Sequence, residues 1–403
     1  SEVVMIGDSK HADVRMAKAH ELDAIWYFPL RHKLWTNYSR ITKRDFAKHA
    51  LKSKFNDLYH HSTFAEYAAP LCYFSKSLSM EMATMGGQIE LNFFARGGYF
   101  MKKTFDAYQA LLTPIEHQVK TFYFMNSRKV VFFAKDAFEH KEGSDARDYE
   151  LQKEYLLAHS HDGKFFMVDE GWYNHSQQAL SEMIDVDTYG YYIGSCRKEK
   201  VEHENRCHRK GILFEMRDDD YTKSPYFGIF CTNRSMYEQL LSAPHGSVRK
   251  YKSITDGMVE IEEKYDEREK YIYERYTRSL QEMMLVNIKG LAAWYADRSI
   301  SVSQLANLML KSALFNSRIR CCFLNDLDRN MVDNCAGNQS FQVKGIKDVR
   351  INPVELLLHP AEYLGMMAKV QRKLVDKPVL LIPYYILASM AYGYIRIIDL
   401  LRY

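Results

Sequence analysis

Short apolar runs alternate with stretches of helical periodicity through the middle of this chain. Runs of four to six apolar residues are typical of buried strands, whereas apolar residues that recur every three or four positions predict helices with one buried face. The predicted strands are residues 89–94, 121–124, 164–168 and 189–193, and the predicted helices are residues 64–85, 100–112, 150–159 and 176–184. Because such alternation builds a sheet covered by helices, we expect an α/β fold with an open, mostly parallel sheet over residues 70–235.

The pattern differs on either side of this core. Near the start, a strand at residues 3–6, a helix at 13–20 and a strand at 24–28 read as the end of another α/β domain. Beyond residue 253 the spacing is helical over residues 256–296, 302–315 and 353–375. We therefore divide the chain into a domain end (1–30), a basic and polar linker (31–63), an α/β core (64–252) and a mainly helical part (253–403). Because the chain opens inside a strand, we expect it to be a piece of a longer polypeptide.

Composition and charge narrow the class of protein. The 55 basic and 51 acidic residues give a net charge of +4, which is too even for a dedicated nucleic-acid binder. The aromatic content of 14% favours broad, half-polar surfaces such as those that bind carbohydrate. Seven cysteines without a regular framework indicate reduced thiols, so we expect a cytoplasmic protein.

The C-terminus raises the question of a membrane. Residues 378–395 are eighteen residues without a charge, the lower limit for a helix that spans a bilayer. The run contains Pro383, Ser389, Gly393 and four tyrosines, and Arg396 follows it at once. We therefore expect a buried or interfacial helix, with peripheral contact at the inner face of the cell membrane.

Two aspartates near the start suit a hard cation. Asp8 and Asp13 lie five residues apart in a loop between a strand and a helix, and Mg²⁺ prefers such oxygen ligands. The sequence therefore predicts a Mg²⁺ site at these two residues.

Glycines and basic residues follow two of the predicted strands. Gly98 and its neighbours would let backbone amides approach an anion at a helix N-terminus, and Arg96, Lys102 and Lys103 add positive charge. Ser127 and Arg128 close the next strand in the same way. A pyrophosphate or other di-anion is one interpretation, and a glycine turn with solvated lysines is the other.

Acids end the strand at residues 164–168. Asp169 and Glu170 precede a polar loop with His175 and Gln177, a layout that loosely resembles phosphoribosyl-pyrophosphate sites, where acids hold the ribose hydroxyls. Either acid could also be a general base toward an acceptor hydroxyl, and the competing interpretation is a strand end with helix-capping residues. In a later loop, His245-Gly246-Ser247, the histidine could serve as an acid, a base or a hydrogen-bond donor to a phosphate. A lone histidine in a loop is, however, usually just solvated.

Taken in order, these segments resemble one family. Its signature F-x-x-R-[DE]-G-x-x-x-x-K resembles residues 92–103 (NFFARGGYFMKK), its S-R strand end resembles residues 126–128 (NSR), and V-D-x-G-W with a later Gln resembles residues 168–177 (VDEGWYNHSQ). Residues 190–192 (GYY), 210–214 (KGILF) and 245–247 (HGS) follow in the family's order. This is the region fused behind a haloacid-dehalogenase-like phosphatase in bacterial capsule and O-antigen synthesis proteins. Residues 7–19 (GDSKHADVRMAKA) resemble the last motif of that phosphatase, whose nucleophile we expect upstream of Ser1.

The resemblance implies a ribofuranosyl (strictly, phosphoribosyl) transferase from a multidomain capsule polymerase. Such a domain takes 5-phosphoribosyl 1-pyrophosphate and attaches ribose 5-phosphate to a polysaccharide acceptor, with inversion at the anomeric carbon. It implies catalytic roles for Asp169, Glu170 and His175. It assigns Mg²⁺ to the phosphatase remnant and leaves open whether the transferase also needs the ion. The residues expected to bind substrate are Arg96, Gly98, Lys102, Lys103, Ser127, Arg128, Gln177, His245, Gly246 and Ser247.

One position departs from the family. Gly97 stands where the signature has an acid, so an acidic base or ribose ligand at that place is lost and Asp169 becomes the remaining candidate. Two other functions stay open. One is a transferase that uses a nucleotide-activated sugar or sugar phosphate, and the other is a non-catalytic assembly module of a capsule polymerase.

Overall fold

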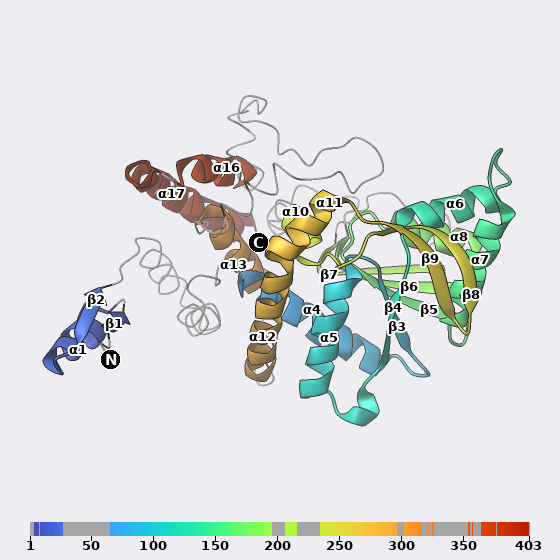
Figure 1. The fold of residues 1–403 in the computed structure, drawn as a ribbon, viewed down its shortest axis with the longest axis horizontal. Helices are drawn as coiled ribbons and strands as arrows, with labels where there is room; N and C mark the ends of the chain where they lie inside the picture. Colours follow the sequence, from blue (N-terminus) through green and yellow to red (C-terminus); the bar gives the residue numbers. More distant parts are fainter. Residues whose placement is uncertain are drawn as a thin grey trace. The chain divides into compact units, whose positions relative to one another are not determined.

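The computed structural model describes residues 4–7, 9–26, 65–195, 206–215, 234–295, 302–315, 321, 325, 354, 357, 364–375 and 377–402 (Figure 1). The chain divides into two compact units, Ser1–Asn56 and Asp57–Tyr403. In the first, β1 (Val4–Gly7) pairs in parallel with β2 (Asp23–Trp26), and the helical segments η1 (Lys10–Arg15) and α1 (Met16–Ala19) join them. The strand–helix–strand order expected there is present. The predicted linker at 31–63 lies outside the described residues.

The second unit is built on a five-stranded parallel sheet, in the order β4-β3-β5-β6-β7. The expected α/β fold with an open parallel sheet is therefore confirmed. The strands are β3 (Glu90–Phe94), β4 (Lys120–Phe124), β5 (Lys164–Asp169), β6 (Asp187–Ser195) and β7 (Cys207–Glu215).

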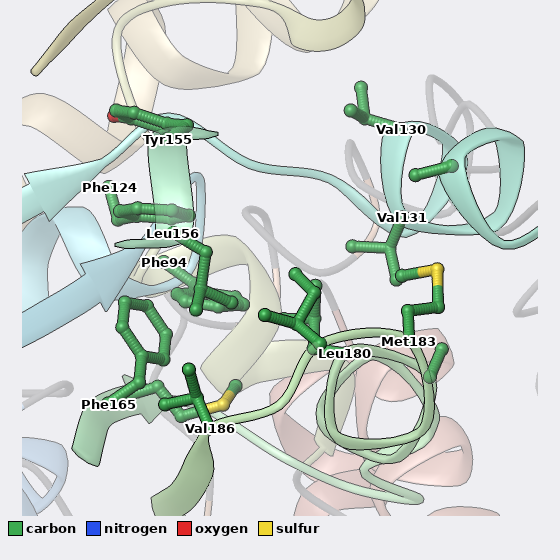
Figure 2. Packing of buried hydrophobic residues seen from close by; sticks show 14 of the residues in the cluster. Phe94, Phe124, Val130, Val131, Tyr155, Leu156, Phe165, Leu180, Met183 and Val186 are labelled. Carbon is green, nitrogen blue, oxygen red and sulfur yellow. The ribbon is translucent and has the colours of Figure 1, made fainter. Parts of the chain in front are cut away.

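Helices cover both faces of this sheet (Figure 1). Phe94, Phe124 and Phe165 point to one face, where they pack with residues of three helices (Figure 2). Those helices are α6 (Arg128–Phe138), α7 (Ala146–Ala158) and α8 (His175–Met183). On the other face Phe93 meets Phe105 of α5 (Gly98–Leu112), and α4 (Ala65–Thr84) and α12 (Arg278–Tyr295) pack against α5. Because both faces are covered, the central strand β5 holds four consecutive apolar residues, which made its position predictable.

An antiparallel hairpin lies where helix was expected. β8 (Ser247–Thr255) pairs with β9 (Met258–Lys264), so the prediction of a helix from residue 256 is wrong over these residues. The sequence MVEIEEK alternates with the period of two of a strand, and Val259 and Ile261 pack against the core that α6, α7 and α8 cover. A dense run of charges obscured that alternation.

From residue 267 onward every described element is helical, as expected. The chain continues through α11 (Glu267–Ile272), η5 (Tyr273–Thr277) and α12 to α13 (Val302–Leu314), α16 (Leu364–Leu374) and α17 (Pro378–Arg402), while α10 (Arg234–Leu240) precedes the hairpin.

One helix of the core, α6, was not predicted. It begins at the Ser127 cap, and four apolar residues on one of its faces are buried against the sheet.

Candidate functional site

The carboxyl ends of three neighbouring strands bring the predicted motifs together. Arg96 follows β3, Ser127 follows β4, and Asp169 is the last residue of β5. Since β4, β3 and β5 are adjacent and parallel, these residues lie at one edge of the sheet. That edge is where open α/β sheets bind ligands.

Arg96 joins this edge to the hairpin and to α11. Its Nη1 donates to Ser247 Oγ at 2.8 Å and to Glu269 Oε2 at 2.9 Å. Both charged side chains are largely buried, with 14% and 13% of their surfaces exposed. The fold therefore brings the first core motif, with Arg96, into contact with the last, with Ser247. These two residues are 151 positions apart in the sequence.

Asp169 and Glu170 form a tightly coupled pair of acids. The Glu170 amide donates to Asp169 Oδ1 at 2.9 Å, and Oε2 of Glu170 is buried with no hydrogen-bond partner among the described residues. Burial raises the pKa of Asp169 to about 6, although the hydrogen bonds with Glu170 and the charge of Arg128 lower it. Burial raises the pKa of Glu170 well above its usual range, and the charge of Asp169 raises it further. Burial and the charge of each carboxyl on the other favour a proton held by the pair, with Asp169 as the more acidic member.

The carboxylate of Glu170 fills the space beside Gly97. A Cβ on residue 97 would overlap Oε2 and Cδ of Glu170. The backbone of Gly97 itself is helical, with a φ of −56°, so other residues could adopt it. The glycine leaves room for the Glu170 carboxylate in its observed position, and a larger residue at 97 would displace that carboxylate. The carboxylate of Glu170, which comes from the end of β5, thus lies beside the residue that follows Arg96 in the chain.

A histidine and a tyrosine extend the site toward β4. Nε2 of His245 lies 2.7 Å from Tyr123 Oη, and Nδ1 lies 2.9 Å from the Gly246 carbonyl oxygen. Because a carbonyl only accepts, Nδ1 carries the proton and Tyr123 donates to Nε2. Burial lowers the pKa of His245, so its ring is neutral at pH 7. Sequence reasoning missed Tyr123; its place one residue before the end of a strand was the available signal.

Ser127 and Arg128 begin α6 at the same edge. Ser127 Oγ accepts from the Val130 amide at 3.2 Å, which caps the helix, and donates to the Val248 carbonyl at 2.7 Å. Arg128 is exposed in the first turn, near enough to Asp169 to lower the pKa of that carboxyl. A helix N-terminus with an exposed arginine suits an anion.

A third acid lies near the pair. Glu238 of α10 accepts from Trp172 Nε1 at 3.1 Å, and its charge raises the pKa of Asp169. Trp172 is buried and stacks on Phe214, with 6.0 Å between the ring centroids. The tryptophan therefore positions Glu238 from within the core.

Four other predicted side chains make contacts of their own. Lys102 pairs with Asp106 at 2.7 Å, and Lys103 donates to Tyr99 at 2.6 Å, both within α5. His175 is exposed and stacks on Tyr173. The buried amide of Gln177 bonds to Thr188, His208 and Tyr192, which ties α8 to the sheet.

The two predicted glycines are places of close packing. A Cβ on Gly98 would meet the Phe93 backbone, and one on Gly246 would meet the backbone of Lys264 and Tyr265. The first glycine lets α5 start against β3, and the second lets the 245–247 loop lie on β9.

The predicted Mg²⁺ ligands belong to the first unit. Asp13 Oδ2 accepts from the Ser9 amide at 2.8 Å, and Asp8 lies outside the described residues. Among the residues that the structure describes, no group of three or more His, Cys, Asp or Glu side chains could hold a metal. The Mg²⁺ site stays a prediction.

No protein-family model matches this chain, and no curated protein matches it significantly. The family resemblance therefore rests on the motifs alone.

Proposed function

We propose that this chain is a glycosyltransferase that moves ribose 5-phosphate from 5-phosphoribosyl 1-pyrophosphate to a hydroxyl of a polysaccharide acceptor. The observation that carries the proposal is the convergence of Arg96, Arg128 and the Asp169–Glu170 pair at one edge of a parallel sheet. Cations for phosphates, acids for a ribose and a base for an acceptor are the groups that this reaction needs.

The reaction follows from these groups. Asp169 accepts the proton of the acceptor hydroxyl as that oxygen bonds to the anomeric carbon. The bond from this carbon to the pyrophosphate oxygen breaks, and pyrophosphate leaves with both electrons of that bond. A base with a pKa near 6 is ionised at neutral pH and still accepts a proton readily. Arg96 and Arg128 stabilise the charge that develops on the leaving group.

Glu170 has a different role from Asp169. Being protonated, it donates a hydrogen bond from beside Gly97, which suits a ribose hydroxyl oxygen. It thereby supplies the acidic group that the family carries one residue after the arginine. The Ser247 hydroxyl and His245, fixed by Arg96 and Tyr123, complete the wall on the hairpin side.

The biological setting belongs to the same proposal. We place the domain in capsule or O-antigen synthesis, within a multidomain polymerase whose phosphatase part would remove the 5-phosphate. Its location would be the cytoplasm at the inner face of the cell membrane.

Mass spectrometry tests the reaction. The protein is incubated with 5-phosphoribosyl 1-pyrophosphate and short capsule-type acceptors, beside Asp169→Asn. We expect an acceptor that gains one ribose phosphate, release of pyrophosphate, and loss of both in the variant. If product forms only with a nucleotide-activated sugar, that compound and not 5-phosphoribosyl 1-pyrophosphate is the donor. If the folded protein gives no product with any donor, the result favours the non-catalytic assembly module.

A further inference from the structure

We propose that the outward face of α17 binds an anionic lipid surface, with the helix lying in the plane of the membrane. The inference does not depend on the transferase proposal, because it rests on a different part of the molecule and has its own test.

One face of α17 is fixed to the protein. Tyr384, Tyr385, Tyr392 and Ile395 are buried. Tyr384 Oη donates to the Leu314 carbonyl at 2.8 Å, and Tyr392 Oη donates to Asn307 Oδ1 at 2.7 Å, both in α13. A helix held to its neighbour by polar contacts along its length cannot cross a bilayer alone. The apolar run that has the length of a span is thus a helix attached to the surface of the protein.

The opposite face is aliphatic and exposed. Its side chains have between 47% and 74% of their surfaces exposed, and they recur at helical spacing: Val379, Leu380, Ile382, Ile386, Leu387, Met390 and Ile397. Residues 378–395 include no charged side chain. At 1.5 Å per residue the strip is roughly 27 Å long. Single exposed apolar residues are ordinary, but a continuous strip of this length marks an interaction surface.

Positive charge surrounds this strip. Residues 364–402 hold six basic and two acidic residues, a net charge of +4 that equals the net charge of the whole chain. Lys373 and Lys377 are exposed before the strip, and Arg396 lies beside its last residue, Ile397. Anionic headgroups attract such residues while the aliphatic side chains enter the acyl boundary.

The same charges argue against a second copy of the chain. If two copies packed through this face, Lys377 would lie beside Lys377 in a parallel pair and beside Arg396 in an antiparallel pair. Both arrangements bring like charges together. A protein partner also needs polar groups among the apolar ones to fix its orientation, and the strip offers none among its side chains.

Vesicle flotation with the full chain tests the proposal. We expect the protein to float with phosphatidylcholine–phosphatidylglycerol vesicles, more weakly at high salt, and not with phosphatidylcholine alone. Ile386→Glu with Met390→Glu should lower the partition coefficient at least about tenfold, because charges replace inserted side chains. Lys373→Glu with Lys377→Glu should weaken binding and reduce its salt dependence.

Val286→Glu is the matched control, since Val286 of α12 is an exposed aliphatic residue outside the strip. It should bind vesicles like the unchanged protein. Circular dichroism establishes that each variant is folded, and Ile386→Gln gives a milder change at the same place. Three results would overturn the proposal: no flotation of the unchanged protein, equal flotation of Ile386→Glu/Met390→Glu, or a dimer in sedimentation that this variant dissociates.

Discussion

The carboxylate of Glu170 lies where a side chain at position 97 would begin. The two residues come from the ends of neighbouring strands, β5 and β3, and a side chain at 97 would displace the acid from its observed position. The adjacent strand therefore supplies an acid beside the residue that follows Arg96. Gly97, which in the sequence marks the loss of an acid at that place, lies against the carboxylate of Glu170.

Exchanging the two residues tests this relationship. Gly97→Glu should destabilise the protein by about 1–3 kcal/mol, because it overpacks the site and adds a third acid. Glu170→Gly in the same chain should recover most of this stability in urea unfolding, together with activity. Gly86→Ala is the control, since a Cβ there meets nothing within 4 Å. If Gly97→Glu alone is as stable as the unchanged protein, the two positions do not compete for space.

Asp169 should give the activity its pH dependence. A base with a pKa of about 6 is protonated below that pH, so kcat/KM should rise as the pH increases through about 6 and then level off. Asp169→Asn keeps an acceptor for the Glu170 amide but cannot accept a proton, so we expect activity to fall roughly 10²–10⁴-fold. A variant that keeps its activity would remove Asp169 from the base role.

The same carboxyl should lower stability near neutral pH. The native state holds its proton up to about pH 6, whereas an unfolded aspartate loses it near 3.8, so unfolding becomes easier as the pH rises through this window. Asp169→Asn should therefore raise the free energy of unfolding by about 3 kcal/mol at pH 7 and change it little near pH 4. Thermal unfolding at a series of pH values measures the difference, and equal stabilisation at both ends would contradict the assignment.

Arg96 should be irreplaceable by lysine. A single nitrogen, Nη1, bonds to both Ser247 and Glu269. The lysine side chain is one atom shorter, so its ammonium would not reach the same point between these two partners. Arg96→Ala leaves Glu269 largely buried without its partner and should cost about 3–5 kcal/mol. A double-mutant cycle with Glu269→Gln separates the ion pair from packing. Coupling near zero in that cycle would show that the pair does not hold the hairpin to the sheet edge.

Much of the sheet was determined by the sequence itself. Strand β5 is buried on both faces and holds an unbroken apolar run, and β3 is buried throughout although Glu90 and Asn92 interrupt its apolar residues. The polar residues that follow these strands mark the candidate edge of the sheet. Arg96 and Asp169 could be chosen as candidates for this reason. The alternation in MVEIEEK (residues 258–264) is also visible in the sequence, but its charged residues resemble those of an exposed helix. Its pairing with β8 determines that the segment is a strand.

The partners of these residues were decided by tertiary structure. In the sequence, Gln177 looks like a ligand-binding residue of a motif. In the structure, α8 packs against β6 and β7, and the Gln177 amide donates hydrogen bonds to the carbonyls of Thr188 and His208 in the core. The contact of Arg96 with Ser247 joins residues 151 positions apart, and Glu170 enters the space beside Gly97 because β3 and β5 are neighbours. A sequence pattern reports local periodicity and burial, since those depend on adjacent residues. Which distant side chains share a space, and so which acid lies beside Arg96, depends on strand order and packing.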